Sequence, residues 1–250
     1  MYVEGTVNGR ACRFLLDTGA ATSSIQTDAY TASLPTTGTH HSSGVFSAMR
    51  DDLIAVERLQ IGPISRQSFP LTRSPDDGSP RNSLIGMDVL KDHCCHFMLD
   101  SSTLEIDPEQ DFAELQFQPL QFDRKFHPYV RVQCGPANAQ AVWDTGASLT
   151  VADTSFIQRH PDCFTEAGHS TGTDASGSQV ETAMYAMAAI QLGGVQFPSH
   201  RVAAVNLSAV NATLEIPMDL ILGYNLYAQA NWLFDFPNAR WAITRTLQPA

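Results

Sequence analysis

The sequence predicts an all-β protein built from two similar lobes. Short stretches of alternating apolar and polar residues, separated by turn residues such as glycine and proline, dominate the 250 residues. Long runs of helical periodicity are nearly absent. Four landmarks also occur twice, in the same order, in the two halves of the chain. A duplicated unit of this kind favours two lobes that share one architecture.

The first landmark is a hairpin that ends in an aspartate. Residues 3–16 alternate around an Asn-Gly turn and lead straight into Asp17, which Thr-Gly-Ala follows. Residues 130–143 alternate around a Gly-Pro turn and lead into Asp144, which the same three residues follow. In both halves a carboxylate therefore stands where an apolar strand should still be running.

The other three landmarks are a strand–glycine–strand unit, an apolar strand with a glycine and a short helical stretch, and a strand–turn–strand unit. They occupy residues 59–70 and 190–202, 83–90 and 220–227, and 96–106 and 231–243. The spacing between copies grows from 127 residues at the aspartates to 137 at Gly86 and Gly223, so we expect longer loops in the second lobe. Residues 1–106 are predicted to form the N-terminal lobe, 107–126 the connection and 127–250 the C-terminal lobe.

Composition limits the partners and the location. A formal net charge of −11 argues against a nucleic-acid partner, because binding phosphates needs basic patches. No apolar run approaches the ~20 residues of a membrane-spanning helix, so we expect no membrane segment. The five cysteines, an odd set without a compact disulfide spacing, favour reduced thiols. The first residues lack the pattern of a signal peptide, which slightly favours the cytoplasm, but a leader trimmed from the chain would leave the localisation unknown.

Asp17 and Asp144 are the candidate catalytic residues. One Asp-Thr-Gly is a weak pattern, since it also suits a turn in which aspartate caps and glycine takes a positive φ. Two copies at matching places in a duplicated unit mean more, because a pseudo-twofold arrangement brings the two carboxylates together between the lobes. Adjacent carboxylates cannot both ionise cheaply, so one keeps its proton while the other is charged. The pair then supplies a general base that activates water and a general acid, without a metal or another cofactor.

The residues after each aspartate have physical roles in this hypothesis. Gly19 and Gly146 allow backbone and carboxylate to approach closely, with backbone N–H groups available to the charged form. Thr18 and Thr145 provide hydroxyl groups that can bond across the lobe interface and hold the two loops in register. The sequence therefore predicts that these four residues support the active-site loops.

The chain resembles the pepsin and retropepsin group of aspartic peptidases over nearly its whole length. Both halves contain the group's motif: a hydrophobic pair, Asp-Thr-Gly, a small residue and a later hydrophobic-hydrophobic-Gly. The resemblance implies the bilobal acid-protease fold, with two similar β-barrel-like lobes related by pseudo-twofold symmetry. It implies an endopeptidase that acts on a peptide or protein, with Asp17 and Asp144 as its catalytic residues. It also implies that the two threonines bond across the lobes and that Gly86 and Gly223 pack behind the active-site loops.

The chain departs from the family pattern in two places. Ala20 and Ala147 follow the two motifs, as in retropepsins, where pepsins usually have serine or threonine. Because a hydroxyl there would stabilise the charged carboxylate, its absence predicts higher pKa values of the dyad and activity at less acidic pH than in a pepsin. Ala21 stands where family members usually have a polar residue, as Ser148 is in the other copy. It supports an alternative function, a catalytically inactive peptide-binding module on the same fold.

The substrate covers, or flaps, are predicted as hairpins at residues 40–49 and 172–184. Gly44, Val45 and Gly177, at or beside their tips, are the candidate substrate-binding residues of these flaps. Ordinary hairpin loops without a gating role are the alternative. Because one chain carries both aspartates, we predict a monomer; pairing of each lobe with its twin in another molecule is the other possibility.

The segment His-Cys-Cys-His at residues 93–96 contains metal-ligating residue types but enters a predicted strand. Adjacent residues on a strand point to opposite faces, so the four side chains cannot converge on one ion. We therefore interpret this segment as structural.

Overall fold

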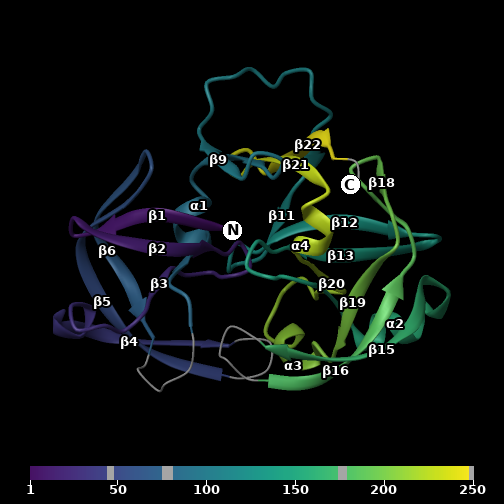
Figure 1. Ribbon diagram of the computed structural model, residues 1–250, viewed down its shortest axis with the longest axis horizontal. Helices are drawn as coiled ribbons and strands as arrows, with labels where there is room; N and C mark the ends of the chain where they lie inside the picture. The colour runs from purple at the N-terminus through teal and green to yellow at the C-terminus, as the bar shows by residue number, and fades with distance from the viewer. Residues whose placement is uncertain (44–47, 75–80, 174–178, 248–250) are drawn as a thin grey trace.

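The computed structural model describes residues 1–43, 48–74, 81–173 and 179–247. These residues form mostly β-strands, arranged in two lobes that lie side by side with a third, shared sheet along one side (Figure 1). The first half of the chain, purple to blue, forms one lobe, and the second half, teal to green, forms the other. The all-β, two-lobed architecture predicted from the duplicated landmarks is confirmed.

The first lobe is a seven-stranded sheet within the described residues. Its strands are β1 (Tyr2–Val7), β2 (Arg10–Leu16), β3 (Ser24–Ile25), β4 (Thr36–Ser43), β5 (Ala48–Ile61), β6 (Ile64–Arg73) and β7 (Leu84–Ile85). They lie in the order β1-β2-β7-β3-β6-β5-β4, and β1 also pairs with β5. The barrel-like shape of each lobe stays a prediction.

The second lobe is a ten-stranded sheet, again counted over the described ranges. Its strands are β11 (Gln121–Phe122), β12 (Pro128–Cys134), β13 (Ala137–Trp143), β14 (Thr150–Asp153), β15 (Phe164–Thr173), β16 (Gln179–Met187), β17 (Ile190–Leu192), β18 (Val195–Phe197), β19 (His200–Val205) and β20 (Leu220–Leu222). The lobes share their unusual pairings. β2 runs parallel to β7 as β13 does to β20, and β3 runs parallel to β6 as β14 does to β19.

The turn of the first hairpin follows from its sequence. Asn8 and Gly9 join β1 to β2 with φ values of 51° and 81°. Positive φ at both central residues defines the type I′ turn, whose twist matches that of the flanking strands. On the β2 side of the hairpin, Phe14 and Leu16 are fully buried, so the alternation that ends at Asp17 points its apolar residues into the core.

The shared sheet joins the two halves of the chain. In the order β10-β22-β21-β8-β9, it consists of β10 (Gln118–Pro119), β22 (Arg240–Thr246), β21 (Ala230–Asp235), β8 (Cys94–Met98) and β9 (Thr103–Ile106). An aromatic cluster packs beneath it, in which Trp143 lies 4.9 Å from Phe97 and 4.3 Å from Phe234 between ring centroids. One hydrophobic core therefore runs through both lobes, and the predicted boundaries at 106 and 127 stay a prediction.

The helices of the described residues are short. They are α1 (Met87–Leu90), α2 (Thr154–Arg159), α3 (Ser208–Asn211) and α4 (Tyr224–Tyr227), with 3-10 turns η1 (Thr31–Ser33) and η2 (Pro161–Cys163). Residues 206–219 between β19 and β20, which include α3, outnumber residues 74–83 between β6 and β7, as the growing spacing between copies predicts. Among the described residues no helix is both long and apolar enough to cross a membrane.

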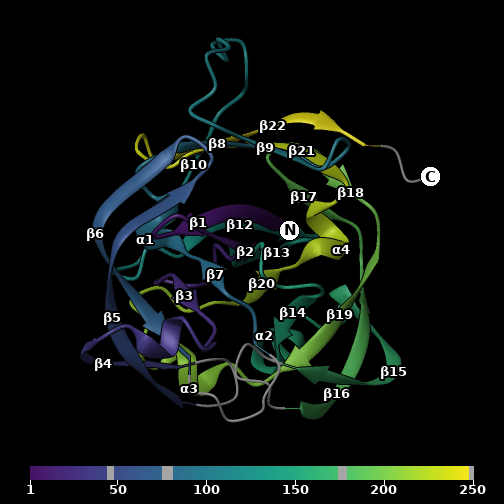
Figure 2. The same ribbon diagram turned by 60° about the vertical axis from the view of Figure 1, so that its left-hand side comes forward.

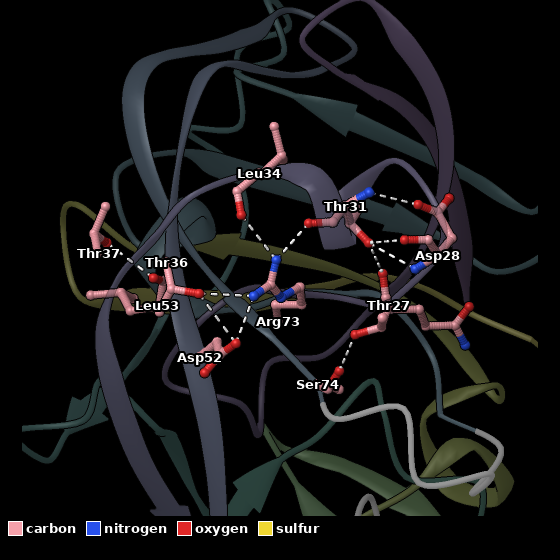
Figure 3. Close-up of polar contacts among 11 residues, drawn as sticks. Thr27, Asp28, Thr31, Leu34, Thr36, Thr37, Asp52, Leu53, Arg73 and Ser74 are labelled. Atoms are coloured by element: carbon pink, nitrogen blue, oxygen red, sulfur yellow. Dashed lines mark hydrogen bonds and ion pairs between the residues drawn. The ribbon is translucent and has the colours of Figure 1, made fainter.

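Arg73, at the end of β6, latches the base of the β4–β5 hairpin (Figure 3). Its guanidinium donates to the carbonyl groups of Thr31 at 2.6 Å and Leu34 at 3.1 Å. It also donates to the carboxylate of Asp52 on β5 at 2.6 Å. The Arg73 side chain is only 11% exposed, whereas the Asp52 side chain is 48% exposed. These contacts of Arg73 hold the base of the β4–β5 hairpin in a fixed position relative to the rest of the lobe.

The hairpins expected to form the two flaps are present as antiparallel strand pairs, β4 with β5 and β15 with β16. Seen after a 60° turn, the two hairpins stand on opposite sides of the same end of the molecule (Figure 2). Gly44, Val45 and Gly177 lie outside the described residues. Their role in binding substrate therefore stays a prediction.

Candidate active site

Asp17 and Asp144 occupy equivalent places, each directly after the second strand of its hairpin. The N–H group of Asp17 donates to the carbonyl of Ile85 on β7 at 3.0 Å, and that of Asp144 donates to the carbonyl of Leu222 on β20 at 3.1 Å. Each aspartate thus extends the parallel pairing of its strand, β2 with β7 or β13 with β20, by one residue before the chain turns. The neighbouring parallel strand holds the backbone of each aspartate in place.

The structure brings the two carboxyl groups together. The side chain of each aspartate shifts the pKa of the other, and the two glycines of the motifs lie against the opposite carboxyl groups. A Cβ atom added to Gly19 would stand 2.5 Å from Oδ2 of Asp144, and one added to Gly146 would stand 2.5 Å from Cγ of Asp17. Because real Cβ contacts are never so short, only glycine allows each loop to cross this close to the other lobe's aspartate.

The two threonines exchange hydrogen bonds across the lobe boundary. The N–H of Thr18 donates to Oγ1 of Thr145, and the N–H of Thr145 donates to Oγ1 of Thr18, both at 3.1 Å. Each hydroxyl then donates onward, Thr18 to the carbonyl of Trp143 at 2.5 Å and Thr145 to that of Leu16 at 2.8 Å. Both threonines are buried, so this closed network fixes the position of one Asp-Thr-Gly loop relative to the other.

Backbone N–H groups face both carboxyl groups. Oδ1 of Asp144 accepts hydrogen bonds from the N–H of Gly146 at 2.7 Å and of Ala147 at 3.2 Å. Near Asp17 the N–H groups of Gly19 and Ala20 act in the same direction and lower its pKa, but that of Ala20 donates to the backbone carbonyl of Asp17 at 3.2 Å. Such donors stabilise the charged form of a carboxyl group. Either aspartate can therefore hold a negative charge in this site.

Burial and mutual repulsion act against that charge. Burial raises the pKa of Asp17 well above its usual range, and the negative charge of Asp144 and the hydrogen bond between the two raise it further. Burial also raises the pKa of Asp144, while the N–H of Gly146 and the hydrogen bond from Asp17 lower it. The pair thus binds one proton more tightly than two separate aspartates would, and shares it.

Gly86 and Gly223 lie behind the two Asp-Thr-Gly loops. The residue after each glycine donates a hydrogen bond to the loop: the N–H of Met87 donates to the carbonyl of Ala20 at 2.8 Å, and that of Tyr224 donates to the carbonyl of Ala147 at 2.9 Å. A Cβ atom on Gly86 would come within 2.7 Å of that same Ala20 oxygen. The close packing that the resemblance implies for these glycines is present in the structure.

Two further side chains, one in each lobe, support the backbone of these glycines and were not predicted from the sequence. Oγ of Ser23 accepts from the N–H of Gly86 at 3.0 Å and donates to Asp88 at 2.6 Å. In the second lobe Oγ1 of Thr150 accepts from the N–H of Gly223 at 3.2 Å and bonds to Asn225 at 3.0 Å. The signal was available: an acid or its amide stands two residues after each glycine, in Gly-Met-Asp and Gly-Tyr-Asn.

Tyr227 supports only the second loop. Its hydroxyl donates to the backbone carbonyl of Thr145 at 3.0 Å, and its ring is buried 5.3 Å from that of Trp143. Burial raises its pKa, so the hydroxyl stays protonated and keeps donating across the working range of pH. The first lobe has Leu90 at the equivalent place, since Leu90 follows Gly86 by the same number of residues as Tyr227 follows Gly223.

The segment at residues 93–96 uses its polar atoms within the fold. Nδ1 of His93 bonds to Asp107 at 2.6 Å, and Nε2 of His96 bonds to Thr244 at 3.0 Å. Across the described part of the chain, no group of three or more His, Cys, Asp or Glu residues is placed to hold a metal ion. The five cysteines, all of them in that part, are free.

Comparison with known proteins agrees with this geometry. The pattern of the family described as aspartyl protease matches residues 3–89 and 130–226. Among solved structures, the aspartic proteinase from Irpex lacteus has the same fold, with a TM-score of 0.55 and 12% sequence identity over 98% of this chain and 94% of that one. No curated protein matches the sequence. Since the family pattern covers most of both lobes, the chain belongs to the aspartyl protease family.

Proposed function

We propose that this protein is an aspartic endopeptidase that hydrolyses peptide bonds with a water molecule activated by Asp17 and Asp144. The observation that carries the proposal is the pair of carboxyl groups at the lobe boundary, Asp17 buried and Asp144 partly buried, each of which lies against the other lobe's glycine. Membership of the aspartyl protease family supports proteolysis in general. The shared proton of the pair supports this particular mechanism.

In the proposed reaction the ionised member of the pair takes a proton from the water as its oxygen attacks the carbonyl carbon of the substrate. The protonated member donates to the carbonyl oxygen, giving a tetrahedral diol. The proton taken from the water then passes to the leaving amine as the C–N bond breaks, while one hydroxyl of the diol returns its proton to the other carboxylate. Each step needs both carboxyl groups in opposite protonation states, which a buried, coupled pair favours.

The substrate in this proposal is a peptide or an unfolded protein segment that binds extended across the lobe boundary. The β4–β5 and β15–β16 hairpins stand on the two sides of that boundary, where they would cover the bound chain. Because both aspartates come from one chain, the active species is a monomer. Gel filtration of the active fraction tests this, and activity confined to a larger species would contradict it.

The function is tested by digesting a mixed peptide library from about pH 3 to pH 7. We expect cleavage by the wild type that a statine-type inhibitor blocks, and no cleavage by Asp17→Asn or Asp144→Asn. Asp92→Asn is the matched control, because that carboxylate is 51% exposed and pairs only with Arg66 among the contacts described. Cleavage that survives either dyad substitution would refute the mechanism.

The same experiment separates the alternative function. A catalytically inactive peptide-binding module would bind the inhibitor and peptides without cleaving them at any pH. Ala21, which lacks the polar side chain of Ser148 in the other copy, is the one feature of the sequence that favours this alternative.

A further inference from the structure

The register of β12 and β13 places a histidine near one aspartate of the dyad. β12 pairs antiparallel with β13 so that Tyr129 faces Val142, and the same register continued by two residues sets His127 opposite Asp144. Opposed residues on one face of such a pair have Cβ atoms about 5 Å apart. Tyr129 and Val142 share one small apolar cluster, so the next residues on that face, His127 and Asp144, are neighbours at the end of the sheet.

The turn before β12 is built around the carboxylate of Asp123. Its Oδ2 lies 2.7 Å from Nδ1 of His127, and its Oδ1 accepts the N–H groups of Lys125 at 2.9 Å and His127 at 3.0 Å. The side chains of Asp123 and His127 are only 2% and 12% exposed. The imidazole is therefore fixed in one orientation, with Nδ1 committed to Asp123.

The two aspartates experience different charges. A positive charge on His127 lowers the pKa of Asp144, whereas the charge that acts most strongly on Asp17 is the negative one of Asp144. The backbone donors differ as well: the carboxylate of Asp144 accepts the N–H groups of Gly146 and Ala147, at 2.7 and 3.2 Å, whereas the N–H of Ala20 donates to the backbone carbonyl of Asp17 at 3.2 Å. These donors and the Asp123–His127 pair, which belongs to the second lobe, act in the same direction and make the site asymmetric.

Other titratable groups near the pair are few among the described residues. The Tyr129 hydroxyl, whose pKa burial and Asp123 both raise, donates to the carbonyl of Ile216 at 2.6 Å. Arg124 is 87% exposed and pairs with Glu215. Burial lowers the pKa of the amino group of Met1, and the negative charge of Asp17 raises it.

We propose that His127, held by Asp123, is a positioning residue that makes Asp144 the ionised base of the dyad and leaves Asp17 as the protonated acid. This inference rests on the proposed function, because it assigns roles within that mechanism. A positive charge on the imidazole favours a negative Asp144. Water is then deprotonated by Asp144, and the carbonyl oxygen of the substrate receives its proton from Asp17.

The first test is the pH dependence of kcat/KM for His127→Gln, which removes the cation but keeps a polar side chain. Without the cation Asp144 ionises less readily, so the acidic limb should move up by about one pH unit. His127→Arg, which restores a positive charge, should return the limb toward its wild-type position. The double variant Asp123→Asn/His127→Gln removes both charges, and its limb should lie between those of wild type and His127→Gln.

His93→Gln is the matched control, because His93 makes the same kind of bond, to Asp107 at 2.6 Å, away from the dyad. It should leave the limb unchanged. Thermal unfolding of each variant separates folding from electrostatics. If His127→Gln is less stable but its acidic limb does not move, His127 has a structural role only and the inference is wrong.

A second readout does not need catalysis. NMR of protein labelled at the aspartate carboxyl carbons follows the dyad directly, with Asp17→Asn and Asp144→Asn for assignment. We expect the lower of the two titrations to belong to Asp144 and to move up in His127→Gln. A lower titration at Asp17 would overturn the inference even if the enzyme is active. The expected titrations without any cleavage would refute the proposed function but leave the protonation order standing.

Discussion

Oγ1 of Thr18 accepts the backbone N–H of Thr145, and Oγ1 of Thr145 accepts the backbone N–H of Thr18, both at 3.1 Å. These two residues are 127 positions apart in the chain, and they bond as if they were related by a twofold axis. The reciprocal bonds hold the two aspartates of the dyad at one place. The first predictions concern this contact.

Thr18→Val should destabilise the protein and reduce its activity. The substitution leaves the carbonyl of Trp143 and the N–H of Thr145 without these partners in a buried place, which costs about 2–4 kcal/mol in unfolding free energy. Urea denaturation measures this loss. Thr18→Ser keeps the hydroxyl and should lose less than half as much; equal losses for Val and Ser would show that the methyl group, not the bonds, matters.

Gly19→Ala and Gly146→Ala should abolish catalysis while leaving most of the fold intact. Each new methyl group would stand 2.5 Å from an atom of the opposite carboxyl group and would push the dyad apart. A displacement of about 1 Å costs on the order of 100-fold in rate. The measurement is kcat/KM beside a circular dichroism spectrum. Gly38→Ala is the control, since a Cβ there would make only ordinary contacts with Leu53, at 3.9 Å; wild-type activity in both dyad variants would contradict the geometry.

Serine in place of Ala20 or Ala147 should extend activity to lower pH. The N–H of Ala147 already bonds to Asp144, and an added hydroxyl would give the charged carboxylate a further donor and lower its pKa. The acidic limb of the kcat/KM profile should then fall by roughly 0.5–1 pH unit. For the wild type, an activity maximum below about pH 3 would contradict the effect assigned to the alanines.

Asp17→Asn should be more stable than the wild type at neutral pH. Because the pKa of Asp17 is raised in the folded state, the folded protein holds this proton more tightly than the unfolded chain does. That stabilisation is complete below the pKa of the unfolded chain and is lost as pH rises through the folded-state value. Asparagine does not ionise and keeps a donor for Asp144, so it avoids the loss.

We expect a gain of about 1–3 kcal/mol at pH 7 that shrinks toward zero near pH 3.5. Urea denaturation of both proteins at the two pH values measures it, with Asp92→Asn as the exposed-carboxylate control. A variant that is less stable than wild type at pH 7 would show that Asp17 is not a source of strain in the folded state.

The elements that depend on local interactions could be predicted from the sequence. The Asn8-Gly9 turn, the apolar alternation that ends at Asp17, and the repetition of both near Asp144 depend on near neighbours in the chain. The duplication also predicted one long-range feature, namely that the two lobes contain equivalent structural elements. Two lobes with equivalent Asp-Thr-Gly loops followed from it.

The contacts between the two lobes, and the differences between them, became known only from the tertiary structure. The shared sheet pairs Phe97 on β8 with Trp232 on β21, a contact for which no local pattern exists. The buttress of Ser23 on Asp88 and the pairing of His127 with Asp123 also depend on where chains meet in space. Propensity and periodicity act over a few residues, whereas the charge and burial that set apart the two carboxyl groups of the dyad come from the packing of distant segments.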